Sequence, residues 1–465
     1  MNATMHKELS RLIGSEHVVD APPRQSPYNA DSSNHRGVEG RADAVALPGT
    51  AEEVAAVVAW CYEHDVGIVP RGGGTGVLGG AVAVQGGVVL SLERLRRVRE
   101  LEPELWRMLA EAGVSTHDVQ RLARENGLMF APDPGAGEQS QIGGNVATNA
   151  GGPHALKYGV TGTWVAGVEV VLAPGELVQL GSWAAKDVAG YDLKSLMVGS
   201  EGTLGVITAV RLRLLPAPEA AIASVVFFST REQGCVAMRT VLAAGMRPSV
   251  LDFMDGETLR ISAGAYPGEV PAGAGFAVIC EVDGSCEEAH AQQHVLVELL
   301  QEQAMAIEQT QDVKELWRWR DGTNPAVTAA RGGKVSEDVV FPLERLAEGL
   351  ERFERIAHSH GMHSCAWGHG GEGNVHATVL VDPSQEVELD AAQAVGEQLF
   401  ELVVELGGSV AGEHGVGLLK RGRLALQWDE KALDMHEQIK RVFDPKGLLN
   451  PGKKLARYPA RSLGT

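Results

Sequence analysis

The sequence contains no run of about 18 consecutive apolar residues, which is the length that a membrane-spanning helix needs. Its first 14 residues carry charges and lack the apolar core of a signal peptide. Both absences favour a cytoplasmic protein. Any association with the inner face of a membrane would then depend on partner proteins.

Cysteine is scarce, and the five cysteines form no C-x-x-C pair. We therefore expect no iron–sulfur cluster bound by this chain, and the scattered thiols fit small buried side chains. Positive charge is also in short supply, because the net charge is −19. This balance argues against a nucleic-acid-binding surface, although a local arginine or metal ion can still attract an anionic substrate.

Two common nucleotide-binding motifs are missing. The segment Pro70–Gly80 has six glycines in eleven residues but no Gly-Lys-Ser/Thr ending, so it is not a P-loop. It leads into Val82–Val84 and Gly87–Leu92, which we expect to be strands, whereas a Rossmann fingerprint opens a helix. A backbone this bare can gather N–H groups into a nest for a pyrophosphate, or it can simply turn between strands. The segment alone leaves both interpretations open.

Two more glycine-rich stretches follow, Gln141–Gly152 and Gly199–Ile207, and we expect both to be loops between strands. Three such loops are hard to explain as turns alone. They offer backbone donors together with amide and hydroxyl side chains, which suit a flavin or a diphosphate. After Pro216–Pro218, shorter strands and helices, among them a long helix over Glu287–Ala306, indicate a second domain.

Histidines and a glutamate carry the strongest chemical signal. His369 and His376 are separated by glycines that can turn the backbone back on itself, and Glu413 follows in a second glycine-containing motif. Two imidazoles and a carboxylate suit catalytic Zn²⁺ or Mn²⁺. The spacing is not diagnostic, however, and from spacing alone core or surface histidines are the better interpretation.

These motifs resemble those of one flavoprotein family. Ile142–Asn145, Gly151–Gly159, Gly199–Ile207, Gly368–His376 and Gly412–Gly417 are similar to motifs of the vanillyl-alcohol oxidase/PCMH superfamily of FAD-linked oxidases. The closest resemblance is to the branch with the FAD subunits of glycolate oxidase, the cytochrome-linked D-lactate dehydrogenases and the D-2-hydroxyglutarate dehydrogenases.

The resemblance covers residues 42–455 and implies an α+β fold. It predicts a PCMH-type FAD-binding domain, a ferredoxin-like substrate (cap) domain, and a C-terminal segment that returns to the FAD-binding domain. The expected boundaries are 1–41 for an N-terminal segment, 42–218 for the FAD-binding domain, 219–412 for the cap domain and 413–465 for the C-terminal segment.

The resemblance also implies a set of FAD-binding residues. Some relatives tether the flavin through a histidine in the first glycine-rich loop, where this chain has Gly72–Gly74, so we predict noncovalent FAD. The segment Ser182–Ala189 is longer than the family pattern and predicts a small surface insertion. The implied FAD-binding residues are Pro70, Arg71, Gly72, Gly73, Gly74, Thr75, Gly76, Gly79, Pro134, Gly143, Gly144, Asn145, Thr148, Gly151, Gly202, Ile207 and Asn450.

For the metal, the resemblance implies His369, His376 and Glu413 as ligands of a divalent ion, Zn or Mn. His414, next to the implied ligand Glu413, would serve as the general base that takes the hydroxyl proton. Asn374 would help to hold the substrate carboxylate.

The cation for that carboxylate would come from the segment around two tryptophans. Arg320 aligns with a substrate-binding arginine of the family, and a guanidinium suits bidentate pairing with a carboxylate. The alternative is an ordinary amphipathic helix end. Relatives that act on dicarboxylates have a further lysine, but Lys334 is offset by about two positions and Ser336 stands in its place. This offset favours a short monocarboxylate.

Together these features predict an FAD-dependent oxidase or dehydrogenase of a small D-2-hydroxy acid, glycolate or D-lactate. The hydride would pass to flavin N5, and the product would be the 2-oxo acid. The missing Rossmann fingerprint disfavours NAD as acceptor and leaves a quinone, a cytochrome, an electron-transfer flavoprotein or partner subunits with FAD or iron–sulfur centres. The alternatives are a D-2-hydroxyglutarate dehydrogenase and a flavin subunit that is active only within a multi-subunit glycolate oxidase.

Overall fold

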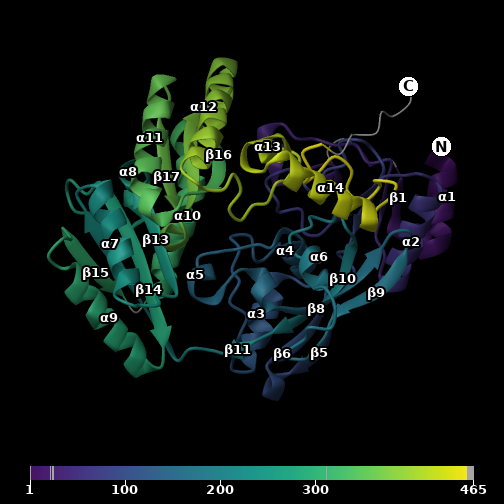
Figure 1. The fold of residues 1–465 in the computed structure, drawn as a ribbon, viewed down its shortest axis with the longest axis horizontal. Helices are drawn as coiled ribbons and strands as arrows, with labels where there is room; N and C mark the ends of the chain where they lie inside the picture. The colour runs from purple at the N-terminus through teal and green to yellow at the C-terminus, as the bar shows by residue number, and fades with distance from the viewer. Residues whose placement is uncertain (1, 21, 24–25, 311, 458–465) are drawn as a thin grey trace. The chain divides into compact units, whose positions relative to one another are not determined.

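The computed structural model describes residues 2–20, 22–23, 26–310 and 312–457, and it divides into two compact units (Figure 1). The first unit consists of residues 1–151, 159–217 and 413–465, and the second of residues 152–158 and 218–412. Each unit has its own sheets and its own hydrophobic core. None of the helices formed by the described residues is both long and apolar enough to cross a membrane.

The first unit begins with a small sheet of strand order β1-β2-β4-β3. Helix α2 connects β2 to β3, which run parallel to β4 on either side of it. Thr50 caps α2 by accepting a hydrogen bond from the backbone N–H of Glu53. The elements are α1 (Asn2–Ile13), β1 (Val18–Asp20), β2 (Ala44–Ala46), α2 (Ala51–Glu63), β3 (Ile68–Arg71) and β4 (Val88–Ser91).

A second, antiparallel sheet of the first unit has the order β5-β6-β10-β8-β9, and a short ribbon pairs β7 with β11. Its elements are β5 (Val98–Glu102), β6 (Arg107–Glu111), α3 (Thr116–Glu125), β7 (Leu128–Met129), α4 (Ile142–Thr148), β8 (Val165–Leu172), β9 (Glu176–Gly181), α6 (Leu193–Met197), β10 (Val206–Arg213) and β11 (Leu215–Pro216).

The C-terminal segment returns to the first unit, as predicted. It contains α13 (Leu424–Gln427) and α14 (Glu430–Phe443), and Leu449 then forms a parallel bridge with Ile68 on β3. The fully buried Asp444 accepts hydrogen bonds from Tyr62 of α2 and from the backbone N–H of Leu449. Leu449, late in the sequence, therefore adds a bridge to the sheet that begins with β1.

The second unit is built on one antiparallel sheet of order β15-β12-β14-β13-β17-β18-β16. Its elements are α5 (Ala155–Tyr158), β12 (Ala220–Phe228), α7 (Arg231–Ala243), β13 (Val250–Asp255), α8 (Gly256–Ser262), β14 (Phe276–Gly284), α9 (Cys286–Leu300), β15 (Ala306–Thr310), α10 (Val313–Arg331), β16 (Gly333–Val340), α11 (Leu346–Ser359), β17 (Ser364–Gly368), β18 (Asn374–Val381) and α12 (Glu386–Glu405).

The two faces of this sheet are packed differently. One face contributes Phe253 and Val375 to a large apolar core with α7, α9, α11 and α12. The other face contributes Met254 and Trp367 to a smaller cluster with residues of α8 and α10. Because successive strand residues point to opposite faces, the polar residues of the strands are also divided between the two faces. Most of the polar strand residues of the functional site lie on the face that packs against α10, which we call the α10 face.

Three local expectations are wrong. Residues 142–148 form a helix rather than a loop, because the missing side chain of Gly143 lets the helix lie against Ala112; a Cβ at Gly143 would stand 2.5 Å from that of Ala112. Val82–Val84 is a turn region rather than a strand. Helix α9 ends at Leu300, so that Ala306 begins a strand. The alternative interpretation of Arg320 as part of a helix end is also not met, because Arg320 lies in the middle of α10.

Candidate functional site

The first glycine-rich segment follows β3 and presents bare backbone on one side. A Cβ at Gly73 would stand 2.0 Å from the backbone oxygen of Gln139, so this glycine is required for a close approach of two backbones. At Gly76 and at Gly144 of α4, by contrast, a Cβ would meet no other atom within 4 Å. These two glycines leave open space at the surface of the unit.

Arg71 lies at the end of β3 and points its guanidinium into the protein. It is 8% exposed, and its two terminal nitrogens donate to the backbone oxygens of Ala30 and Pro27, each at 2.8 Å. It therefore holds the segment that precedes β2. Its assignment to the cofactor stays a prediction.

The other predicted residues of the second glycine-rich stretch belong to α4 or adjoin it. Asn145 donates from Nδ2 to the hydroxyl of Thr116 at 2.5 Å, and the Thr148 hydroxyl donates to the backbone oxygen of Gly144. Both side chains thus support the helix. Pro134 is partly buried in the loop before α4.

The third stretch is a turn that packs against the first. Gly202 has φ +71°, and a Cβ there would stand 3.0 Å from Cγ of Pro70. Ile207 is buried on β10. Gly79 also has a positive φ of +74°. The turn and the first glycine-rich segment are therefore in direct contact.

Two side chains from the C-terminal segment brace this contact. Asn450, 2% exposed, donates from Nδ2 to the backbone oxygens of Gly80 at 2.9 Å and Glu201 at 2.7 Å. The Lys453 ammonium donates to the backbone oxygen of Val82 at 2.8 Å and to Oδ1 of Asn450 at 3.0 Å. Burial lowers the pKa of Lys453 to about 8, against the opposing effect of Asp31 and Glu201. Sequence reasoning identified Asn450 but missed Lys453.

The donors and acceptors left at this surface fit an extended polar cofactor. Among the described residues, the buried Oε1 of Gln141 and Oγ of Ser200 have no hydrogen-bond partner. Both belong to the glycine-rich stretches, and the side chain of Gln141 lies near Gly72 of the first stretch. Buried polar atoms are normally paired, so these two atoms are suited to a bound group such as the ribityl or diphosphate part of FAD.

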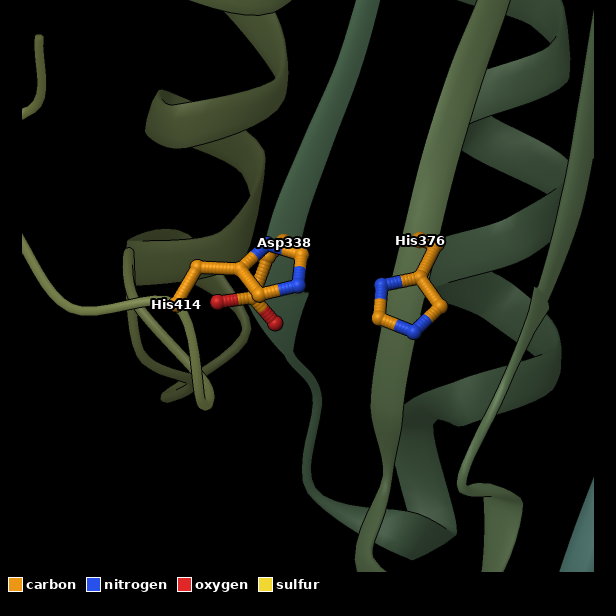
Figure 2. Close-up of side chains that lie close together, drawn as sticks. All are labelled: Asp338, His376 and His414. Carbon is orange, nitrogen blue, oxygen red and sulfur yellow. The ribbon is translucent and has the colours of Figure 1, made fainter. Parts of the chain in front are cut away.

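In the second unit, five titratable side chains line the α10 face of the sheet. Asp338 on β16 is the register partner of His376 on β18, and the two lie side by side (Figure 2). Directly opposed residues share a face of the sheet. Trp367 on β17 is opposite both His376 on β18 and Met254 on β13, so these residues lie on the same face as Asp338. We call the following residues the polar row: Glu281, Asp252, His369, His376 and Asp338, with exposures of 3%, 1%, 5%, 8% and 2%.

The two predicted metal-binding histidines meet within the polar row. The rings of His369 and His376 are 5.8 Å apart between centroids and nearly perpendicular. Each offers a nitrogen within 4.8 Å of one on the other ring. The glycines between them form a short helical turn and then β18, which returns His376 toward His369.

Asp252 connects His369 to Arg320. One carboxylate oxygen lies 2.8 Å from Nδ1 of His369, and the other accepts from Nε of Arg320 at 2.8 Å. Burial would raise the pKa of Asp252, but the nearby His369 and Arg320 outweigh it and lower this pKa to about 2. Asp252 was missed from the sequence, where its only signal is an acidic residue within the apolar strand Val250–Asp255.

Asn374 has its amide nitrogen occupied. Nδ2 donates to Oδ1 of Asp338 at 2.7 Å and to the backbone oxygen of Val339 at 3.3 Å, whereas Oδ1 is buried without a partner among the described residues. The atom left over is therefore an acceptor. It suits a hydroxyl donor better than the carboxylate that we expected it to hold.

Glu281, at the other end of the row, was also missed. It accepts hydrogen bonds from Trp317 at 2.8 Å and Ser249 at 3.0 Å, and it pairs with Nε2 of His154 at 3.0 Å. His154 belongs to the segment 152–158, which lies on the second unit. Part of the Gly151–Gly159 motif is therefore explained by these contacts.

Glu413 and His414 belong to the first unit, at the start of its last segment. Glu413 lies beside Gly151, where a Cβ would stand 2.8 Å from the carboxylate. Gly412, the residue before it, is held in the second unit by a hydrogen bond from its N–H to Oδ2 of Asp338 at 2.9 Å. Glu413 is thus covalently next to a residue fixed at the polar row.

Comparisons with known proteins agree with this arrangement. Residues 42–181 match the FAD binding domain family, and residues 217–454 match the C-terminal domain of FAD linked oxidases. The chain is 32% identical to the glycolate oxidase subunit GlcD of Bacillus subtilis over 97% of this chain and 96% of the relative. It is 33% identical to a D-lactate dehydrogenase of Archaeoglobus fulgidus over 96% and 98% of the two chains.

A solved structure shows the same fold. Crystalline p-cresol methylhydroxylase superposes with a TM-score of 0.81 at 18% identity, over 97% of this chain and 96% of that one. The glycine-rich segments of the first unit lie within the matched FAD-binding domain, and the polar row lies within the matched C-terminal domain. The chain therefore belongs to the FAD-linked oxidases, with the family's FAD-binding domain and its C-terminal domain.

Proposed function

We propose that this protein uses FAD to oxidise a small D-2-hydroxy acid, glycolate or D-lactate, to the 2-oxo acid. The observation that carries the proposal is the polar row, where the buried imidazoles of His369 and His376 meet and His369 shares the carboxylate of Asp252 with the guanidinium of Arg320. Such a set can hold a metal ion beside an anchor for a carboxylate. The names of the relatives, an oxidase subunit and a dehydrogenase of 2-hydroxy acids, support the same substrate class.

A divalent metal, Zn or Mn, would be held by His369 and His376. Their near-perpendicular, buried rings are chemically suited to such an ion. Glu413 would be the third ligand, on the grounds that it follows Gly412 in the chain and matches the Gly-Glu-His-Gly motif of the family. A metal in this place would lower the pKa of a substrate hydroxyl.

The protein's own residues would then divide the remaining tasks. Arg320 would pair with the substrate carboxylate, with its plane set by Asp252. Asn374 would orient the substrate hydroxyl by accepting its hydrogen bond at Oδ1 before the proton is transferred. His414 would take the hydroxyl proton.

FAD, when bound, supplies N5 as the acceptor of the Cα hydride. The three glycine-rich segments would hold it without a covalent bond, because Gly72–Gly74 offer no side chain for a tether. Electrons would leave to an acceptor other than NAD, such as a quinone, a cytochrome, an electron-transfer flavoprotein or a partner subunit. Any contact with the inner face of a membrane would be made through such partners.

The alternative is a D-2-hydroxyglutarate dehydrogenase. One observation favours keeping it in view. The Lys334 ammonium lies 4.9 Å from the centre of the Trp367 ring, on the same face of β16 as Ser336 and Asp338. A cation on this face could meet a second carboxylate. A flavin subunit that is active only with partners is the remaining alternative.

Anaerobic reduction of the bound flavin tests the proposal. Glycolate, D-lactate, L-lactate and D-2-hydroxyglutarate are mixed with the full-length FAD-loaded protein, with and without EDTA. We expect bleaching by glycolate or D-lactate that is lost on chelation. His376→Gln should slow the reduction by more than about 100-fold, whereas His358→Gln, on the exposed side of α11, should not. Bound FAD that no 2-hydroxy acid bleaches would contradict the proposal.

A further inference from the structure

We infer that Asp252 is a positioning residue that sets the metal-binding nitrogen of His369 and the plane of the Arg320 guanidinium at the same time. The inference rests on the proposed function, because it assigns a role in that site to a residue outside the predicted set. The geometry that carries it is a single buried carboxylate with one oxygen on each partner, both at 2.8 Å.

The contact with His369 decides which ring nitrogen is available. A carboxylate accepts hydrogen bonds, so the proton of the neutral imidazole is placed on Nδ1, facing Asp252. The lone pair is then on Nε2. Ligating histidines generally have this kind of partner, which fixes the tautomer and the orientation of the ring. With Nδ1 committed, only Nε2 of His369 can bind a metal.

The contact with Arg320 fixes the other half of the site. The guanidinium is planar, so a hydrogen bond from Nε fixes the plane of its terminal nitrogens. A carboxylate substrate needs those nitrogens in one plane for a bidentate contact. Asp252 therefore links the orientation of the metal ligand to the orientation of the carboxylate anchor.

The position of Asp252 suits this task. It lies on β13, which has β14 on one side and β17 on the other, and it is 1% exposed. A side chain on a central strand has little freedom to move. A purely structural ion pair with Arg320 would need only one of the two carboxylate oxygens, whereas here the second is used by His369.

The test compares Asp252→Asn with the unmodified full-length protein. An asparagine presents one oxygen and one NH₂, so it cannot accept from both partners. We expect affinity for Co²⁺, measured by competition with a chromophoric chelator, to fall 10–100-fold. The KM for glycolate or D-lactate should rise roughly tenfold. FAD content should not change, because the FAD-binding residues lie in the other unit.

Two further variants separate positioning from loss of stability. Asp255→Asn removes another buried carboxylate of the same strand, one that accepts hydrogen bonds from the backbone N–H groups of Thr258 and Ala366, and should leave both quantities unchanged. Arg320→Lys should raise the KM and leave Co²⁺ affinity unchanged. Only the Asp252 variant is expected to change both.

The outcomes distinguish the inference from the proposed function. An unmodified protein that binds no metal and is not reduced by any 2-hydroxy acid overturns the proposed function. An unmodified protein that does both, with an Asp252→Asn variant that is folded and unaltered in both, overturns only the inference. If Asp252→Asn does not fold, Asp252→Glu keeps the charge but displaces it by one methylene. This second variant should lower Co²⁺ affinity, and unchanged affinity would overturn the inference.

Discussion

Arg71 in the first unit and Arg320 in the second are both largely buried, but they have different kinds of partner. Arg71 donates to two backbone carbonyl oxygens, whereas Arg320 donates to the carboxylate of Asp252. In the first unit the guanidinium of Arg71 binds backbone oxygens and so fixes the shape of a loop. In the second, charged side chains themselves form the polar row. The difference is that the first unit has bare backbone at its glycine-rich segments, whereas the second gathers charged side chains in the polar row.

The largest expected effect comes from adding a side chain to the bare backbone of the first glycine-rich segment. Gly73→Ala should destabilise the protein by at least about 3 kcal/mol, because the new Cβ would stand 2.0 Å from a backbone oxygen. Gly76→Ala is the matched control, since a Cβ there meets no other atom within 4 Å. Urea unfolding should show no more than about 0.5 kcal/mol for the control.

The same pair tests what the open space is for. We expect Gly76→Ala to release FAD more readily than the unmodified protein, as measured by the fluorescence of free flavin after dilution. Unchanged FAD retention together with unchanged stability would mean that Gly76 does not face the cofactor.

Asp255, a second carboxylate of β13, can be compared with Asp252. Its hydrogen-bond donors are the backbone N–H groups of Thr258 and Ala366, whereas Asp252 pairs with charged side chains. Burial raises the pKa of Asp255 to about 6, and hydrogen bonds from Thr258 and Ala366 offset this only in part. The folded protein therefore holds a proton that the unfolded chain releases near pH 4. Asp255 should cost about 3 kcal/mol of stability as the pH rises from about 4 to 6.

Asp255→Asn checks this sign. Between about pH 4 and 6, thermal or urea unfolding should show a stability that falls less steeply with rising pH in the variant than in the unmodified protein. Asp252 should show no such loss there, because its pKa is lowered to about 2 and its stabilising effect is complete above about pH 4. Parallel pH profiles for the two proteins would contradict the assignment to Asp255.

The smallest expected effect comes from replacing one arginine with lysine. Arg71→Lys should destabilise the protein by about 1–2 kcal/mol, because an ammonium cannot reproduce a planar fork that reaches Ala30 and Pro27 together. The main effect of Arg320→Lys should be on the KM rather than on the free energy of unfolding. Chemical unfolding and steady-state kinetics of both variants check this prediction. A larger loss of stability in Arg320→Lys and a larger change of KM in Arg71→Lys would contradict it.

Much of the fold could be predicted because its signals are local. The strand Val250–Asp255 lies in an apolar run, and Thr50 at the start of α2 is a residue type that commonly caps helices, so both can be recognised from neighbouring residues. The helix over residues 142–148 could not be predicted, since Gly143 serves helix packing rather than a turn. Strand β15 was missed because its residues alternate weakly and it lies at the edge of the sheet.

The candidate site was predictable only where its residues lie in recognisable motifs. His369 and His376 are brought together as the glycine-rich segment suggests. Asp252 lies more than a hundred residues earlier and meets His369 through sheet pairing that no local pattern specifies. Asp338 likewise reaches His376 only through the register of β16 with β18. The roles proposed for His414 and Glu413 stay predictions.

The division of the chain has a consequence for its synthesis on the ribosome. The backbone passes from one unit to the other after residues 151, 158, 217 and 412, so neither unit is a continuous stretch of sequence. Ile68 on β3 must wait for Leu449, which is made about 380 residues later. At 5–20 residues per second this delay is roughly 20 to 80 s. The nascent chain would therefore carry an unfinished first unit through most of translation.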